Sequence, residues 1–311
     1  MPDPSAPDLD LAIVGGGIAG LTAGLVAARA GLHVAVFDRM GPGGQLINVD
    51  RVENYPGFPS GIAGYELGPA TLEQATAAGM KIEYAEVHAL ARDGTYWQLN
   101  TDRGEIRAAA VIVASGSELA KLGLEGETKL HGHGLSYCAT CDAEFFRDQP
   151  VAVIGGGDSA LDETLVLAPV ASSVTVITRE ALSGAQIGID RVGALDNVSV
   201  RPETTVTALH GTDELEGISV APAAGGDPER LDVSGVFVYV GLEANTSLLE
   251  GLVALDPAGH VEVDAMMATA QPGLFVAGDL RAGSVRLLVS CAGDGATAAV
   301  AAERYIRTLS K

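Results

Sequence analysis

Two cysteines separated by two residues, Cys138 and Cys141, are the best candidates for chemistry in the stretch YCATCDAEFF. Such a pair can bind a metal ion, form a structural crosslink or exchange electrons. Asp142 follows directly, where a carboxyl group can supply or accept the proton that thiolate chemistry requires. Charge complementarity at the start of a helix would also explain an acid at this position. Three kinds of chemistry are therefore open to the pair.

A zinc site is the first alternative, because His131 and His133 precede the cysteines and provide two further ligands. Structural zinc sites usually separate two ligand pairs by a loop of about a dozen residues, whereas here all four residues lie within positions 131–141. We therefore predict no metal site. A structural disulfide is disfavoured because so short a loop removes little entropy from the unfolded chain. C-x-x-C pairs switch readily between dithiol and disulfide, so a redox pair is the favoured interpretation.

The composition limits what the rest of the chain does. A length of 311 residues suits two domains, and 47% hydrophobic with 19% charged residues is typical of a soluble, well-packed protein. The net charge of −21 argues against a nucleic-acid or anionic-membrane partner. The start of the chain, MPDPSAPDLD, lacks the features of a signal peptide, and no apolar run reaches the ~20 residues of a membrane span. With only three cysteines, a cytoplasmic protein is expected.

A nucleotide-binding pattern opens the chain. The segment LDLAIV predicts a buried strand, Gly15 to Gly20 (GGGIAG) a tight turn, LTAGLVAARAG a helix, and HVAVFD a second strand ending at Asp38. This order is the dinucleotide fingerprint in its full context. The glycines let backbone N–H groups approach a pyrophosphate at the start of the helix, and an acid at the end of the second strand can hold ribose hydroxyls.

The pattern recurs about 140 residues later in PVAVIG, Gly155 to Ala160 and the helix LDETLVLAPVA. A late strand in PGLFVAGD, with the helix after it, is assigned to the first domain. The predicted fold is α/β, with two Rossmann-like three-layer domains. A discontinuous FAD domain comprises 1–117 (1–8 a flexible tail) and 243–311. It is interrupted by a nucleotide and dithiol domain at 118–242. Two strands that end in glycine, at 109–117 and 235–246, are the expected crossing points and form a hinge.

These motifs together resemble the low-molecular-weight thioredoxin reductases, FAD-dependent pyridine nucleotide-disulfide oxidoreductases. The resemblance covers GGGIAGLTAG, GPGGQL, RVENYPGF, the CATCD placed before VAVIGGGDSA, and PGLFVAGD. It implies that FAD binds the discontinuous domain and NADPH the inserted one. Electrons then pass from nicotinamide to flavin, to the disulfide, and to thioredoxin or a thioredoxin-like protein. A homodimer and rotation of the inserted domain are also implied.

The resemblance also assigns roles to individual residues. Cys141 is the cysteine that faces the flavin, Cys138 attacks the thioredoxin disulfide, and Asp142 is the acid. The residues implied in FAD binding are Gly15, Gly17, Ile18, Ala19, Gly20, Asp38, Arg39, Gly44, Gln45, Leu46, Asn54, Val87, Ala114, Gly116, Gly278, Asp279, Arg286, Leu287 and Leu288. Those implied in binding NADPH or NADH are Gly155, Gly157, Asp158, Ser159, Ala160 and Arg179.

The chain departs from the family pattern where NADPH is recognised. An H-R-R-x-x-x-R cluster that neutralises the 2′-phosphate is replaced by the residues from Thr178 to Gly184 (TREALSG), which keep only Arg179. Each lost charge-assisted contact is worth about 1.5–3 kcal/mol, so we predict weakened NADPH binding. NADH would favour an acid at the end of the strand, and Glu180 lies only nearby, so the fit to NADH is mediocre too.

Other departures leave the partner and the direction of electron flow open. The family's Arg-Gln-Ala at the flavin is Arg286-Leu287-Leu288 here, its arginine before the motif is His133, and the residues after CATCD are AEFF. One alternative is a reductase fed by ferredoxin or another donor. A second is a dithiol oxidase that forms disulfides in a small molecule, with oxygen as acceptor. A third is a non-catalytic flavoprotein that binds a partner according to redox state.

Overall fold

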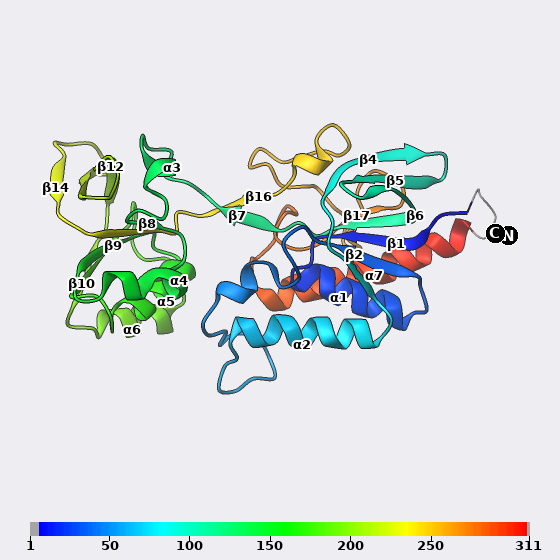
Figure 1. The fold of residues 1–311 in the computed structure, drawn as a ribbon, viewed down its shortest axis with the longest axis horizontal. Helices are drawn as coiled ribbons and strands as arrows, with labels where there is room; N and C mark the ends of the chain where they lie inside the picture. Colours follow the sequence, from blue (N-terminus) through cyan, green and yellow to red (C-terminus); the bar gives the residue numbers. More distant parts are fainter. Residues whose placement is uncertain (1–5, 310–311) are drawn as a thin grey trace. The chain divides into compact units, whose positions relative to one another are not determined.

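The computed structural model describes residues 6–309 and separates into two compact units. The first unit combines Met1–Glu118 with Glu243–Lys311, and the second comprises Leu119–Leu242. Figure 1 shows the second unit inserted between two parts of the first along the chain. The boundaries lie within one residue of those expected from the positions of the two fingerprints.

A sheet of seven strands forms the centre of the first unit. Its order is β3-β2-β1-β6-β5-β4, with β17 also paired to β6. The strands are β1 (Leu9–Val14), β2 (Val34–Phe37), β3 (Lys81–Glu83), β4 (Val87–Asp93), β5 (Tyr96–Thr101), β6 (Gly104–Val113) and β17 (Leu274–Val276). The first half of β6 pairs antiparallel with β5, and its second half pairs parallel with β17. β1, β2, β3, β6 and β17 are parallel, so their carboxyl ends share one edge.

Helices cover one face of these parallel strands, as Figure 1 shows for α1 (Ile18–Arg29), α2 (Gly64–Ala77) and α7 (Leu288–Leu309). Alternate residues of β1 divide between the two faces. Leu11 and Ile13 pack toward the helices, while Ala12 belongs to a second core that includes the fully buried Trp97. Both faces of the sheet are buried, which explains why the strand reads as a continuous apolar run.

The second unit repeats this plan with a parallel sheet of order β11-β10-β9-β15-β8. Its strands are β8 (Leu135–Ser136), β9 (Pro150–Ile154), β10 (Ser173–Ile177), β11 (Val198–Arg201) and β15 (Gly235–Val238). One core packs the sheet against α4 (Ala139–Asp142) and α5 (Asp158–Leu167). A further helix, α6 (Gln186–Gly193), lies between β10 and β11 in the chain. The other core packs it against α3 (Glu127–Leu130) and an antiparallel sheet of β12 (Thr204–His210), β13 (Gly217–Pro222) and β14 (Glu229–Leu231).

The two segments that join the units pair with each other. They form a two-stranded ribbon of β7 (Ser117–Leu119) and β16 (Leu242–Ala244). The N–H of Ala120 donates to the carbonyl of Gly241 at 3.0 Å, and the N–H of Asn245 donates to Gly116 at 3.0 Å. A pair of adjacent connections is what the sequence predicts at the crossing points, and its function as a hinge remains a prediction.

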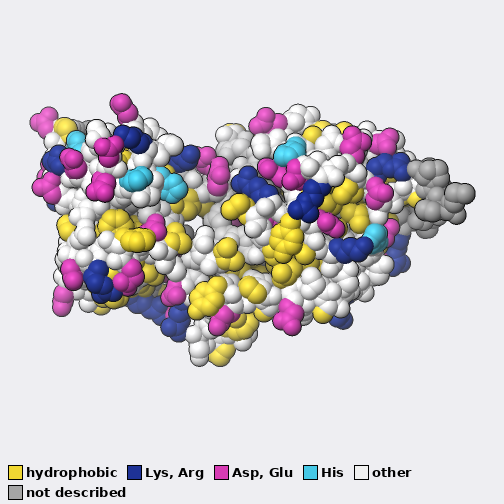
Figure 2. Space-filling model, in the orientation of Figure 1, with side chains coloured by type: hydrophobic (Ala, Val, Ile, Leu, Met, Phe, Trp, Pro, Cys, Tyr) yellow, Lys and Arg dark blue, Asp and Glu magenta, His cyan; other side chains and the backbone are white. Residues whose placement is uncertain are grey.

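The α/β fold with two parallel sheets is confirmed. Acidic side chains are spread over the visible surface of both units in Figure 2, in keeping with the net charge of −21. Within residues 6–309, none of the helices combines the length and the apolar character that crossing a bilayer demands.

Candidate functional site

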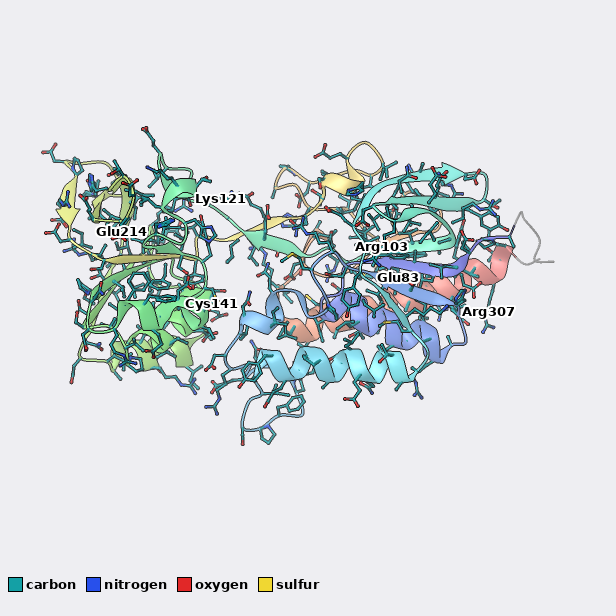
Figure 3. All side chains as sticks on the ribbon, viewed as in Figure 1. Glu83, Arg103, Lys121, Cys141, Glu214 and Arg307 are labelled. Atoms are coloured by element: carbon teal, nitrogen blue, oxygen red, sulfur yellow. A yellow bond between two sulfur atoms is a disulfide. The ribbon has the colours of Figure 1, made fainter. Side chains whose placement is uncertain are left out.

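The two cysteines lie where β8 passes into α4. Cys138 precedes the first residue of the helix and forms a disulfide with Cys141, with their Cα atoms 5.3 Å apart, a usual separation for this bond. The backbone N–H of Cys141 donates to the Sγ atom of Cys138 at 3.2 Å. Cys141, labelled in Figure 3, is exposed and Cys138 is half-buried. The disulfide therefore lies at the surface of the second unit.

Asp142 is held beside the disulfide by Ser136. The buried Ser136 hydroxyl lies 2.6 Å from Oδ2 of Asp142 and also accepts the backbone N–H of Cys138 at 3.0 Å. A serine hydroxyl can donate one hydrogen bond and accept others, so it links the carboxyl group to the backbone of the first cysteine. This arrangement fixes the acid within the redox turn, which is defined here as residues 136–142. The sequence interpretation did not identify Ser136.

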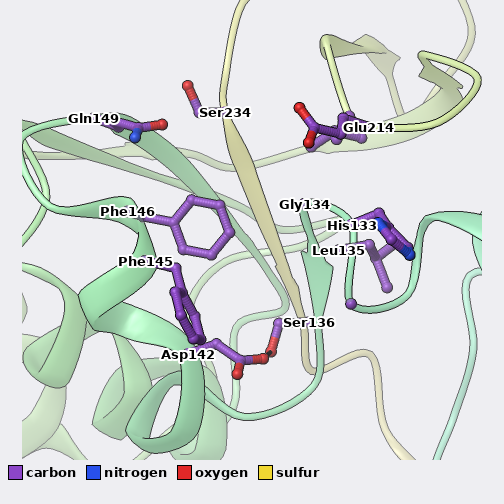
Figure 4. Close-up of a pocket in the computed structure, with 12 residues that line it drawn as sticks. His133, Gly134, Leu135, Ser136, Asp142, Phe145, Phe146, Gln149, Glu214 and Ser234 are labelled. Atoms are coloured by element: carbon purple, nitrogen blue, oxygen red, sulfur yellow. Dashed lines mark hydrogen bonds between the residues drawn. The ribbon is translucent and has the colours of Figure 1, made fainter.

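A pocket of about 470 Å³ opens beside the redox turn. Figure 4 shows Ser136 and Asp142 side by side on its wall, with Phe145 and Phe146 next to them. Phe146 is buried and packs edge-on against Phe237, with ring centroids 5.4 Å apart, whereas Phe145 is 76% exposed. The remaining lining residues are Gly132, His133, Gly134, Leu135, Gln149, Glu214, Leu215 and Ser234. His133, singled out in the sequence, thus lies on the same surface as Asp142.

The first glycine turn joins β1 to α1 in the other unit. Gly15 has φ +106°, and a Cβ atom there would lie 2.3 Å from the carbonyl oxygen of Ala114 at the end of β6. A Cβ at Gly20 would lie 1.9 Å from the carbonyl oxygen of Gly15. The carboxylate of Asp38 accepts N–H groups of Gly16 at 2.7 Å and Gly41 at 2.8 Å. Close approach of the backbone therefore requires glycine at positions 15 and 20 of this turn. The hydrogen bonds of Asp38 hold the turn against the following loop.

The turn has the features that a dinucleotide needs. No side chain caps the start of α1, and a Cβ at Gly17 would meet no atom within 4 Å, so the first N–H groups of the helix face open space. Gly44 and Gly278 converge here, since a Cβ at Gly44 would lie 3.2 Å from Cα of Gly17 and one at Gly278 would lie 3.2 Å from Cβ of Ala19. These residues fit a bound pyrophosphate, with Asp38 beside it.

The other residues expected to bind FAD lie in the same unit at different distances from this turn. Asp279 accepts hydrogen bonds from Ser284 at 2.9 Å and from the Cys291 thiol at 3.1 Å, where α7 begins. Leu288 is the first residue of that helix, directly after Arg286 and Leu287. Gln45 donates its side-chain amide to the carbonyl of Ser117, next to Gly116.

Three residues expected to bind FAD have side chains in other surroundings. Arg39 is exposed and forms an ion pair with Glu86 at 3.6 Å. Val87 begins β4 and is buried in the core on the sheet face opposite α1, so only its backbone is available to a ligand. Asn54 lies exposed in the loop of residues 53–59. Their assignment to FAD remains a prediction.

Comparison with known proteins is consistent with this geometry. The family model described as "Pyridine nucleotide-disulphide oxidoreductase" matches residues 9–301. A thioredoxin reductase of Treponema pallidum is 39% identical over 97% of this chain and 98% of its own length, and one of Mycolicibacterium smegmatis is 38% identical over 96% of each chain. The chain belongs to the thioredoxin reductase family of pyridine nucleotide-disulphide oxidoreductases.

Solved structures support the same assignment. The thioredoxin reductase of Lactococcus lactis, described in an FR conformation, superposes with a TM-score of 0.94 at 33% identity, covering 97% of this chain and all of that one. The thioredoxin reductase of T. acidophilum has a TM-score of 0.91 at 31% identity, covering 98% of this chain and all of that one. The predicted resemblance to thioredoxin reductases and the Rossmann-like fold are both confirmed.

The second glycine turn of this thioredoxin reductase homologue differs from the first. Thr178, buried at the end of β10, occupies the place that Asp38 has in the other unit. The segment 183–185 folds onto the turn: the N–H of Ser183 donates to the carbonyl of Gly156 at 2.7 Å, and the N–H of Ala185 donates to Oδ1 of Asp158 at 2.6 Å. The side chains of Arg179 and Glu180 are exposed. Asp158 is thus engaged in closing this segment.

Gly184 stands where the family's arginine cluster has its last arginine. A Cβ atom at this position would lie 2.5 Å from Leu161 and 3.0 Å from the backbone nitrogen of Asp158. The contact with Leu161 involves the end of a flexible side chain, whereas the Asp158 backbone is close enough to hinder a side chain at this position. Residues 183–185 therefore pack closely against the turn, which the sequence pattern did not reveal.

Two further residues at the redox turn escaped the sequence interpretation. Glu163, in α5, accepts the N–H of Ala139 at 2.9 Å through Oε2, and the same N–H lies 3.0 Å from the hydroxyl of Tyr239. Tyr239 is 8% exposed and follows the apolar strand β15. A buried hydroxyl needs a hydrogen-bond partner. A tyrosine directly after a buried strand is therefore the sequence signal that could have pointed to Tyr239.

Proposed function

We propose that the chain is an FAD-dependent thioredoxin reductase, in which electrons from a reduced nicotinamide pass through FAD and the Cys138–Cys141 disulfide to thioredoxin or a thioredoxin-like protein. The observation that carries the proposal is a disulfide beside a fixed acid, in a chain that also holds a dinucleotide turn with an uncapped helix. The close relatives are named thioredoxin reductases, which does not favour the other-donor and oxidase alternatives.

FAD, when bound, converts the two-electron chemistry of a nicotinamide into reduction of the Cys138–Cys141 bond. The residues around the first glycine turn, including Asp38 and Asp279, would hold it. Two electrons and two protons break the S–S bond and give two thiols. The thiolate of Cys138 then attacks a thioredoxin sulfur, which breaks the thioredoxin S–S bond and forms a mixed disulfide. Cys141 attacks the Cys138 sulfur, restores the disulfide and releases thioredoxin as a dithiol.

Asp142 is the proton carrier in this sequence of steps. Oxidation of two thiols releases two protons, and the reduced thioredoxin takes up two. A carboxyl group held at the redox turn by Ser136 can take a proton from the Cys141 thiol as it attacks and pass it to the leaving sulfur. The geometry of Asp142 supports this role, because Ser136 orients one carboxyl oxygen and the other oxygen is left for proton transfer.

The electron donor at the second glycine turn is NADPH or NADH. NADPH binds there more weakly than it would to a complete arginine cluster. Arg179 alone provides a positive charge after β10, and the exposed Glu180 next to it repels a 2′-phosphate. Gly184 supplies no third cation. Homodimer formation and a cytoplasmic location remain predictions.

The test begins with purified protein reconstituted with FAD. Anaerobic addition of NADPH or NADH should lower the visible absorbance of the oxidised flavin. Thioredoxin added afterwards should be reduced catalytically. In C138S the flavin should still bleach but thioredoxin turnover should fall by at least a thousandfold, because the attacking thiol is lost and Cys141 alone cannot release thioredoxin from a mixed disulfide. A colourless protein that cannot be reconstituted with FAD contradicts the proposal, as does full thioredoxin turnover in C138S.

A further inference from the structure

The backbone of the redox turn is held from behind by a carboxylate. Glu163 Oε2 accepts the N–H groups of Ala139, at 2.9 Å, and of Thr140, at 3.3 Å, the two residues between the cysteines. Tyr239 lies 3.0 Å from the same Ala139 nitrogen and hydrogen-bonds to Glu163. The N–H of Cys141 donates to the Sγ atom of Cys138 at 3.2 Å, so the carboxylate takes the two N–H donors that lie between the cysteines.

A negative charge at this position opposes the ionised form of the reduced pair. Thiolates are stabilised by nearby N–H donors and positive charge, and a disulfide whose reduced form is stabilised becomes a stronger oxidant. Glu163 does the reverse, because it occupies two donors and adds a carboxylate. The charged or titratable groups near it are Tyr239, Asp162 and, against Tyr239, Asp142. No positively charged side chain is among these groups.

We propose that Glu163 is a positioning residue that keeps the Cys138–Cys141 couple strongly reducing, by occupying the N–H donors of Ala139 and Thr140 and by placing a carboxylate behind the redox turn that disfavours the thiolate. Tyr239 orients the carboxylate. This inference rests on the proposed function, since a reductase must give electrons to its partner's disulfide and gains from a low potential. Burial raises the pKa of the Glu163 carboxyl, while the hydrogen bonds from Ala139, Thr140 and Tyr239 act in the opposite direction and favour the carboxylate.

The decisive measurement is the thiol–disulfide equilibrium of the full-length protein with FAD bound, in mixtures of reduced and oxidised dithiothreitol at pH 7. Reduction adds two electrons and two protons to the S–S bond while dithiothreitol closes its own disulfide, and alkylation followed by mass measurement counts the thiols. In E163Q, which keeps an oxygen that accepts the Ala139 N–H, the equilibrium constant for reduction should rise about tenfold, or about 30 mV for this two-electron couple. The apparent pKa of the attacking thiol, from alkylation rate against pH, should fall by about one unit.

Two variants separate this role from a purely structural one. Y239F removes the hydroxyl that orients the carboxylate but keeps the carboxylate itself, so the equilibrium should shift in the same direction as in E163Q and by less, about twofold. D148N removes one negative charge elsewhere in the same unit, at an exposed position with φ +59° that asparagine tolerates, and should leave the couple unchanged. Should E163Q fail to fold, E163D takes its place, because withdrawing the carboxylate by one methylene should give a shift of the same sign, about threefold.

The outcomes distinguish the inference from the proposed function. If wild-type protein shows no reversible two-thiol couple, the proposed function itself is wrong. If wild type has the couple but E163Q shifts neither the equilibrium nor the thiol pKa, Glu163 only supports the fold and the inference is overturned. An equal shift in Y239F or D148N would overturn it too, since the effect would then not depend on the carboxylate at Ala139.

Discussion

The two glycine turns of this chain have the same path and different surroundings. Each follows a buried parallel strand and leads into a helix that no side chain caps, at Gly17 in one unit and Gly157 in the other. After the second strand, the first unit has Asp38, whose carboxylate accepts N–H groups of the turn and of the next loop. The second unit has buried Thr178 at this place. In both units the following loop donates an N–H to the turn, from Gly43 to Gly16 at 2.8 Å and from Ser183 to Gly156 at 2.7 Å.

The difference shows that a glycine turn establishes nucleotide-type backbone geometry, while the residues after the second strand decide what binds. Both helix starts are open, since a Cβ at Gly17 or at Gly157 would meet no atom within 4 Å, and the first unit adds a carboxylate. In the second, Asp158 is engaged with Ala185 at 2.6 Å, and the only retained arginine is exposed beside an acid. Four substitutions test this comparison.

The largest effect is expected from G20A in the first turn. A Cβ at Gly20 would lie 1.9 Å from the carbonyl oxygen of Gly15, so the backbone must move where the pyrophosphate is expected. We expect the purified variant to retain less than about a tenth of the wild-type FAD, read as the ratio of flavin to protein absorbance. The control is G293A in α7, where a new Cβ meets no atom within 4 Å and FAD should be retained. Normal FAD content in G20A would show that this turn does not hold the cofactor.

The next effect is expected from D38N. The carboxylate accepts three backbone N–H groups, from Gly16, Met40 and Gly41, and an amide replaces one accepting oxygen by a donor. Loss of one charged hydrogen bond costs about 1.5–3 kcal/mol, so the dissociation constant for FAD should rise by about 10- to 100-fold in titrations of the apoprotein. T178V at the corresponding place in the second unit removes only a hydroxyl and should leave FAD affinity unchanged. Equal losses in both variants would mean that the two turns contribute alike to FAD binding.

A smaller, opposite effect is expected from E180R. Glu180 is exposed, so an arginine fits there and can bond to a 2′-phosphate beside Arg179. We expect the KM for NADPH to fall by about tenfold while that for NADH changes little. E180Q is the matched control, because it removes the repulsion without adding a cation and should give only part of the gain. If E180R leaves both values unchanged, the 2′-phosphate lies elsewhere.

Much of this molecule follows from its sequence, because the motifs combine local backbone rules with strong hydrophobic patterns. The strands around Leu11 and Val151, the turns at Gly15 and Gly155 and the family all agree with expectation. A C-x-x-C followed by an acid indicated a redox pair, and the two cysteines are bonded. These features depend on residues close together in the sequence.

The contacts that escaped prediction join residues distant in sequence. Glu163 and Tyr239 meet Ala139 across separations of 24 and 100 residues, and no spacing rule relates them. A Cβ atom at Gly184 would closely approach Leu161 and Asp158, and only the packed loop reveals this crowding. The buried side chain of Val87 likewise depends on which face of β4 meets the core. Tertiary packing, rather than motif chemistry, decides these points.

The smallest effect is expected from A160G, the reciprocal of G20A. Ala160 is fully buried in α5 at the fingerprint position where the first turn has Gly20. Removing its methyl group costs helix propensity and packing, together about 1–2 kcal/mol in the free energy of unfolding. Urea unfolding of the second unit should register this loss, while FAD content and thioredoxin turnover with saturating donor stay within twofold. Because the second turn already accommodates a methyl group, a loss of FAD in A160G would contradict the assignment of the flavin to the first turn alone.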